Sequence, residues 1–124
     1  MPTLRELMTT SIVEAEPQTS VTQAAATMVA AGVGAAVVMQ GSFLAGILTE
    51  RDVLRAAASG HDLSASSVAD WMTPDPQSAS PDATTEEAAQ IMLLHGFRHL
   101  PIVEGKNVCG VVSLRDLFAA RIRR

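Results

Sequence analysis

The chain has 124 residues, of which 48% are hydrophobic, 18% are charged and 3% are aromatic, and its formal net charge is −4. A chain of this length can bury about two-thirds of its unfolded surface, so it needs neither a disulfide nor a metal in order to fold. The acidic balance argues against a nucleic-acid surface, because phosphate binding needs clustered basic side chains and the basic cluster here is confined to Arg121, Arg123 and Arg124.

The first half of the chain predicts five elements in the order β-α-β-β-α. "SIVEAEP" (11–17) is a short extended segment, and "SVTQAAATMVAAG" (20–32) is a helix with a capping box at its start and a glycine at its end. "AAVVMQ" (35–40) and "FLAGILT" (43–49) are two strands about a tight turn. "TERDVLRAAASG" (49–60) is a second helix that begins at a threonine N-cap.

The second half repeats this order. The matching segments are "PQSAS" (76–80), "TTEEAAQIMLLHG" (84–96), "HLPIVE" (99–104), "NVCGVVS" (107–113) and "SLRDLFAARI" (113–122). A shift of 64 positions brings the two halves into register without a gap, with three pairs of glycines among the identities. The sequence therefore predicts a first repeat over 1–60, a polar linker over 61–66 and a second repeat over 67–124.

These repeats predict a mixed α/β (α+β) fold. Half a sheet with two helices cannot bury its own apolar face well, so we expect the two β-α-β-β-α repeats to pack sheet to sheet with pseudo-two-fold symmetry.

One short motif occurs in both repeats, as "GILTERD" (46–52) and "GVVSLRD" (110–116). Its hydroxyl residue, Thr49 or Ser113, stands at a helix N-terminus, which favours phosphate. Three residues later Asp52 or Asp116 can accept two hydrogen bonds from a cis-diol, and Arg51 or Arg115 offers a positive charge. This set suits a nucleotide, but a hydroxyl followed three residues later by an acid is also an ordinary helix cap, and the spacing leaves both interpretations open.

The chain resembles a tandem pair of CBS domains, the regulatory module also called a Bateman domain. The resemblance covers residues from about 4 to 120 and is carried by three kinds of segment at one period: "GILTERD" and "GVVSLRD", "FRHLPIVEG" (97–105), and the leading "LMTT" (7–10) and "WMTP" (71–74).

The resemblance implies that each aspartate binds the ribose hydroxyls of an adenosine-type ligand and that Thr49 and Ser113 approach its ribose or phosphate. It also implies an adenine between apolar strand residues, with charged residues near the phosphates. In the second repeat these are Leu100, Pro101 and Ile102 for the adenine, and Arg98 or His99 for the phosphates. The first repeat has Gly34, Ala35 and Val37 in place of Arg98, His99 and Pro101, so two equal sites are not expected.

We therefore expect a stand-alone regulatory module that binds an adenine nucleotide or another adenosyl compound in clefts between its repeats and signals to a separate effector protein. AMP, ADP, ATP, NAD and S-adenosyl compounds all remain candidates, and no obligatory cofactor is expected. The resemblance also implies a homodimer. The alternative is a structural or protein-interaction module whose ligand pockets are vestigial.

An enzyme is not expected, since no nucleophile, base and orienting group recur in a recognisable arrangement. A metal site at His95, His99 and Cys109 is not expected either, because Gly96 should end the helix between the histidines. With one cysteine, no apolar run of about 20 residues and no signal-peptide pattern at the start, we expect a cytoplasmic protein with no membrane partner.

Overall fold

The computed structural model describes residues 2–122, with side chains up to residue 120. Arg123 and Arg124 of the C-terminal basic cluster therefore lie outside the described residues, as does the side chain of Arg121. The chain separates into two compact units. The contiguous unit spans Val13–Pro76, and the split unit combines the residues up to Ile12 with those from Gln77 onward.

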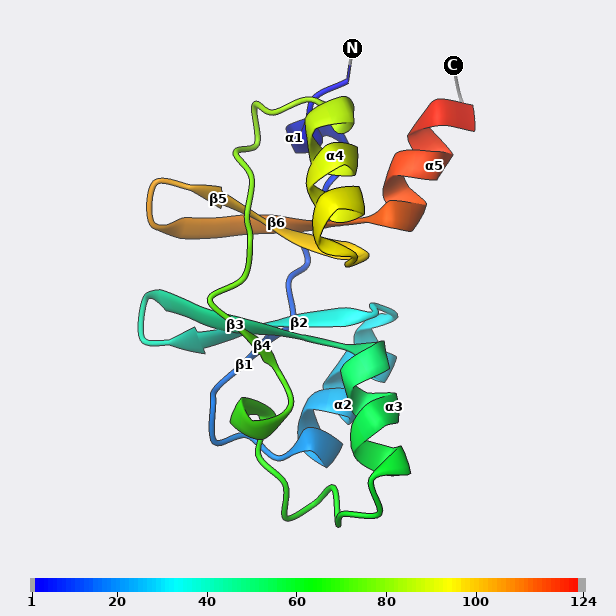
Figure 1. The fold of residues 1–124 in the computed structure, drawn as a ribbon. Helices are drawn as coiled ribbons and strands as arrows, with labels where there is room; N and C mark the ends of the chain where they lie inside the picture. Colours follow the sequence, from blue (N-terminus) through cyan, green and yellow to red (C-terminus); the bar gives the residue numbers. More distant parts are fainter. Residues whose placement is uncertain (1, 123–124) are drawn as a thin grey trace. The chain divides into compact units, whose positions relative to one another are not determined.

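The contiguous unit is a four-stranded sheet with two helices on one face (Figure 1). The order in the sheet is β1-β2-β3-β4, in which β1 runs parallel to β2 and the other neighbours are antiparallel. Its elements are β1 (Glu14–Ala15), α2 (Val21–Ala31), β2 (Ala35–Gln40), β3 (Phe43–Thr49), α3 (Glu50–Ala58), the short 3-10 helix η1 (Val68–Asp70) and β4 (Thr73–Pro74).

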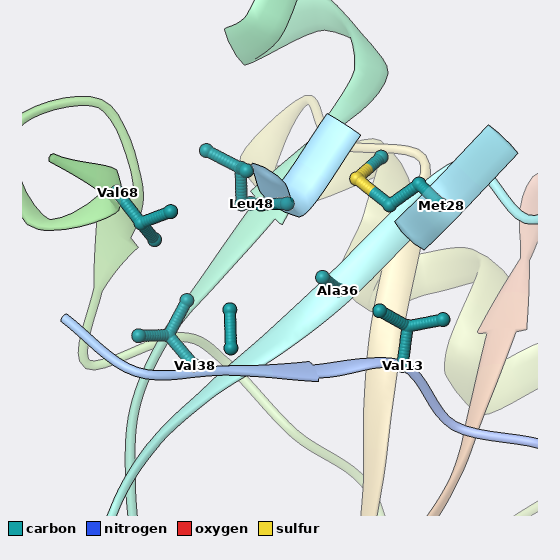
Figure 2. Close-up of a cluster of buried hydrophobic side chains, with 8 residues drawn as sticks. Val13, Met28, Ala36, Val38, Leu48 and Val68 are labelled. Carbon is teal, nitrogen blue, oxygen red and sulfur yellow. The ribbon is translucent and has the colours of Figure 1, made fainter. Parts of the chain in front are cut away.

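The core of the contiguous unit lies between the sheet and α2. Alternate residues of a strand share one face, so Ala36 and Val38 of β2 both point at the helix, where Met28 meets them. Figure 2 shows that Val13, which directly precedes β1, and Val68 of η1 belong to the same cluster. A residue beyond the predicted linker thus belongs to the core of the first unit.

The split unit has the same plan with a two-stranded sheet, β5-β6. Its elements are α1 (Leu4–Leu7), α4 (Thr85–His95), β5 (His99–Glu104), β6 (Asn107–Ser113) and α5 (Leu114–Ile122). All three helices lie on one face of the hairpin (Figure 1), where Leu4, Met92 and Leu117 pack on Leu100 and Val112. The N-terminal helix is therefore part of the second repeat's core.

The short segments that open the two repeats are exchanged between the units. Thr73 pairs with Ile47 of β3 in the contiguous unit, and at the matching position Thr9 pairs with Val111 of β6 in the split unit. Each hairpin is thus completed by the leading segment of the other repeat. The compact units and the sequence repeats are different divisions of the chain, and the predicted repeat boundaries, 1–60 and 67–124, stay a prediction.

The predicted mixed α+β fold class is confirmed, and β2, β3, β5 and β6 begin and end where the sequence placed them. Helices α2 and α4 end at glycines with φ of 69° and 73°, a left-handed conformation that other residues rarely adopt. One expectation was wrong: "PQSAS" forms no strand, but a single parallel bridge from Ala79 to Ile102. The sheet-to-sheet packing of the repeats stays a prediction.

Within the described residues, no helix is long and apolar enough to cross a membrane.

Candidate functional site

In the contiguous unit, the repeated motif forms the junction between β3 and α3. Thr49 is the N-cap of α3, and its Oγ1 accepts a hydrogen bond from the Asp52 backbone N–H at 3.3 Å. The Asp52 carboxylate bonds back through Oδ2, which accepts from the Thr49 N–H at 2.9 Å and from Thr49 Oγ1 at 3.1 Å. This is a complete capping box, so the capping interpretation of the motif is confirmed here.

The second carboxylate oxygen of Asp52 is also engaged. Its Oδ1 accepts from Nη1 of Arg55, one turn further along α3, at 3.4 Å. The Arg55 guanidinium in turn lies over the ring of Trp71 at 5.7 Å, within cation–π range. Asp52 is 7% exposed, so the carboxylate is buried beneath these partners.

The same motif in the split unit joins β6 to α5 with one difference. Oδ2 of Asp116 accepts from the Ser113 N–H at 2.9 Å, and Oγ of Ser113 accepts from the Asp116 N–H at 3.1 Å. The position that matches Arg55 is Ala119, and no hydrogen bond or ion pair from the described residues reaches Oδ1 of Asp116. Asp116 is half-buried, whereas Asp52 is buried.

The hairpin brings the start of β5 beside this junction. His99 is the Cα partner of Ser113, and the carbonyl of Arg98 accepts from the Leu114 N–H at 2.8 Å. Six of the nine predicted site residues therefore belong to one end of the split unit; they are Arg98, His99, Pro101, Ser113, Arg115 and Asp116. The Arg98 and Arg115 side chains are exposed, His99 and Ser113 are half-buried, and Pro101 is buried.

The remaining three predicted residues, Thr49, Arg51 and Asp52, form the matching group of the contiguous unit. The equivalent pairing holds there: Ala35 lies opposite Thr49, and the carbonyl of Gly34 accepts from the Glu50 N–H at 2.9 Å. Because Gly34 and Ala35 have no side-chain donors, this group lacks the cation and imidazole that Arg98 and His99 supply in the split unit.

The strand residues expected around an adenine divide between two faces of β5. Leu100 and Ile102 are fully buried in the core of the split unit. Pro101 lies between them and so projects from the opposite face of the strand. Strand alternation thus separates Pro101 from the two core-facing residues, and the Pro101 side chain is itself fully buried.

Sequence reasoning missed two contributors to these junctions. The first is Arg55, whose signal was its position three residues after Asp52 on a predicted helix. The second is the methionine of each leading segment, which lies against the motif's glycine: a Cβ on Gly46 would meet Met72 Sδ at 2.5 Å, and one on Gly110 would meet Met8 Sδ at 2.6 Å. The glycines of the repeated motif thus allow close packing of a neighbouring segment.

Among the described residues there is no group of three or more His, Cys, Asp or Glu side chains placed to hold an ion. Gly96 ends α4 directly after His95, whose ring stacks on Phe97 with ring centroids 5.7 Å apart. What the split-unit junction offers instead is a hydroxyl, two exposed arginines and a carboxylate oxygen that no other described residue occupies.

Comparison with known proteins assigns the family. The sequence profile of the CBS domain matches residues 4–59 and again residues 68–123. The CBS domain-containing protein YhcV of Bacillus subtilis is 36% identical over 118 residues, which cover 94% of this chain and 84% of YhcV. The crystal structure of the CBS-domain containing protein ATU1752 from Agrobacterium tumefaciens has a TM-score of 0.88 at 31% identity and covers 96% of this chain and 98% of that one.

Two more distant structures share the fold and contain ligands. CBSX2 in complex with AMP has a TM-score of 0.82 at 23% identity, covering 99% of this chain and 98% of that one. The CBS domain pair of MJ0100, in complex with 5′-methylthioadenosine and S-adenosyl-L-methionine, has a TM-score of 0.90 at 18% identity, with the same coverage of 99% and 98%. With two matches to the family profile and this agreement in fold, the chain belongs to the CBS domain family, of which it carries a tandem pair.

Proposed function

We propose that this protein is a regulatory module that binds an adenine nucleotide or a related adenosyl compound. The observation that carries the proposal is the junction of β6 and α5, where one carboxylate oxygen of Asp116 has no partner among the described residues and where the backbone pairs Ser113 with His99 and Leu114 with Arg98. A carboxylate accepts both hydroxyls of a cis-diol, a helix N-terminus favours phosphate, and an exposed arginine supplies a counter-charge.

The fold relatives support the ligand class. CBSX2 is seen with AMP, and MJ0100 is seen with 5′-methylthioadenosine and S-adenosyl-L-methionine. These ligands share an adenine and a ribose that carries a cis-diol, and they differ in what is attached at the 5′ position. An apolar strand and a carboxylate would recognise the adenine and the ribose, which all these ligands share. Arg98 and Arg115 would contact the group at the 5′ position, which differs among them.

A regulatory role requires that the ligand bind two states of the module with different affinity. We propose that the output passes through protein contacts: a second copy of the chain and a separate effector. The support is a set of large apolar side chains exposed at matching positions of the two repeats, Val29 with Leu93 (81% and 80% exposed) and Leu54 with Phe118 (70% and 60% exposed). Exposed apolar groups of this size commonly mark interaction surfaces.

Neither turnover nor a metal cofactor is part of the proposal. The cytoplasm is the proposed compartment, since the single cysteine, Cys109, suits a reducing environment.

A second candidate function is a protein-interaction module without a ligand. Its support is the pair of capping interactions, which give Asp52 and Asp116 a structural role that needs no ligand. The two candidates differ in what the substitution Asp116→Asn does. The asparagine carbonyl can still accept from the Ser113 N–H, so the cap is kept, but the open acceptor becomes a donor.

A thermal-shift screen against AMP, ADP, ATP, NAD, S-adenosylmethionine and GMP tests the proposal. A ligand at 100 times its dissociation constant adds about 2.7 kcal/mol of stability, which raises the melting temperature by several degrees in a protein of this size. We expect a shift with at least one adenosyl compound and its loss in Asp116→Asn. If no adenosyl compound shifts the melting temperature at millimolar concentration, the interaction module is the better explanation.

A further inference from the structure

The two junctions differ in a way that bears on how many ligands the chain binds. In the contiguous unit, both oxygens of Asp52 have protein partners: the Thr49 cap holds Oδ2 and Arg55 holds Oδ1 at 3.4 Å. In the split unit the cap holds Oδ2 of Asp116, and no described side chain occupies Oδ1. The difference comes from one position, because Arg55 is matched by Ala119.

Arg55 is held in place by more than Asp52. Its guanidinium lies 5.7 Å from the centroid of the Trp71 ring, and that ring is edge-on to His61 with centroids 6.1 Å apart. The residue that matches Trp71 in the split unit is Leu7, which has no aromatic face. The contiguous unit thus has both the cation that pairs with the carboxylate and the ring that supports the cation.

A ribose diol that approached Asp52 would have to displace Arg55 from Oδ1. The ion pair is half exposed on the arginine side, with 53% of that side chain accessible, so its displacement weakens a competing ligand by about 2–5-fold. The ligand would also lack any counterpart of the Arg98 and His99 side chains, because Gly34 and Ala35 stand there. The absence of one charge-assisted hydrogen bond to phosphate weakens binding by about 10-fold or more.

We propose that Arg55 obstructs the diol acceptor of the contiguous unit and that, because Gly34 and Ala35 also supply no cation there, the chain binds one phosphate-bearing adenosyl ligand, at the Asp116 junction of the split unit. The inference rests on the proposed function, and it adds the stoichiometry of that function and a residue that limits it. Arg55 acts by occupying the carboxylate through its own side chain, and Ala119 leaves the matching carboxylate open.

Isothermal titration calorimetry of the full chain with adenosine, AMP and S-adenosylmethionine measures the stoichiometry directly. Adenosine and S-adenosylmethionine carry no phosphate, so they should bind the contiguous unit only about 2–5-fold more weakly than the split unit. For AMP, whose phosphate the contiguous unit has no cation to pair with, we expect one equivalent per chain. We expect Asp116→Asn to abolish this binding, because the contiguous unit does not replace it. A chain that binds two equivalents of AMP with similar affinity, or an Asp116→Asn variant that still binds one equivalent of AMP, overturns the inference.

A second pair of variants tests the role of the arginine. Ala119→Arg places a guanidinium three residues after Asp116, as Arg55 is placed after Asp52, and Ala119→Met adds similar bulk without charge. Adenosine is the probe, because it has the diol and no phosphate for the new cation to attract. We expect Ala119→Arg to bind adenosine about 2–5-fold more weakly than Ala119→Met does.

These experiments test three claims separately: the blocking role of Arg55, the proposed function and the stoichiometry. Equal affinity of Ala119→Arg and Ala119→Met overturns the blocking role of Arg55, even if Asp116→Asn fails to fold. Failure of the wild-type chain to bind any of the three compounds overturns the proposed function, and the inference with it. Binding of two equivalents of AMP with similar affinity overturns the inference alone and leaves the proposed function standing.

Discussion

Alanine substitution of the two glycines in the repeated motif, Gly46 and Gly110, should destabilise the protein to different extents. A Cβ on Gly110 would lie 2.6 Å from Sδ and 2.8 Å from Cγ of Met8, which are atoms of a flexible side chain. A Cβ on Gly46 would lie 2.5 Å from Sδ of Met72 and also 2.8 Å from the backbone oxygen of Thr73. A methionine can turn aside, but the Thr73 carbonyl belongs to β4, and its movement disrupts the β3–β4 pairing.

The magnitudes follow from the two kinds of contact. Overpacking of a well-packed site costs about 1–3 kcal/mol, and the loss of a glycine's freedom in the unfolded chain returns about 0.4–1 kcal/mol where the backbone conformation suits alanine. Gly110→Ala belongs at the low end, with a net loss of about 1 kcal/mol or less. Gly46→Ala belongs at the high end, with a net loss of about 2 kcal/mol, or roughly 8 °C in melting temperature.

Urea denaturation followed by circular dichroism gives these free energies, and an unchanged m-value shows that the denatured state is the same. The decisive measurement repeats each glycine substitution in a chain that carries Met8→Ala or Met72→Ala. Gly110→Ala should lose most of its cost in Met8→Ala, because of the three close atoms only the Met8 Cβ, at 3.0 Å, remains. Gly46→Ala should stay destabilising in Met72→Ala, because the Thr73 oxygen remains. Equal costs at the two glycines, or a cost at Gly110 that does not depend on Met8, would refute this reasoning.

Three further predictions concern caps and charges. Thr84→Ala should destabilise the chain by about 1 kcal/mol in urea melts, because Thr84 caps α4 through a complete capping box, whereas Thr84→Ser should keep most of that stability. A double-mutant cycle on Asp52 and Arg55 should give a coupling of about 0.2–1 kcal/mol that falls at high salt, since Arg55 is half exposed; a coupling of zero would mean that the pair is not formed in solution. The Ser64 hydroxyl and backbone N–H lower the pKa of Asp62, so the stability from these bonds is present at neutral pH and is lost as the pH falls through the lowered pKa. Ser64→Ala should raise the pKa of Asp62 in an NMR titration. An unchanged pKa would show that the bonds do not persist in solution.

Local signals in the sequence determined most of the secondary structure. The N-caps Ser20 and Thr84 and the αL glycines bound α2 and α4, although of these two helices only α4 has a complete capping box, and the β-rich runs on both sides of Gly41 and Gly105 indicated the two hairpins. These features depend on residues within a few positions of one another, so the sequence alone is sufficient to predict them. The repeat is likewise evident from the order of residues alone, because the two halves match at one constant period.

The sequence also placed the candidate site residues at the strand–helix junctions where the structure has them. It did not decide whether the second oxygen of each aspartate has a protein partner. The spacing from Thr49 to Asp52 is the same as that from Ser113 to Asp116, and both pairs cap a helix. Whether the second oxygen is open depends on Arg55 and on Trp71, which lies beyond the linker. The ring reaches that arginine because η1 folds back onto the first unit, a tertiary contact with no local signature.

Tertiary structure alone decided which segments complete each unit. Residues 2–12 open the predicted first repeat but pack in the unit of the second, and η1 and β4 follow the linker but pack in the unit of the first. The elements concerned are four residues long or shorter, so they carry no periodicity that a sequence pattern can detect. They take their places because Leu4 and Val68 fill the apolar cores that the hairpins and long helices leave open, and that free energy comes from burial against residues far away in the sequence.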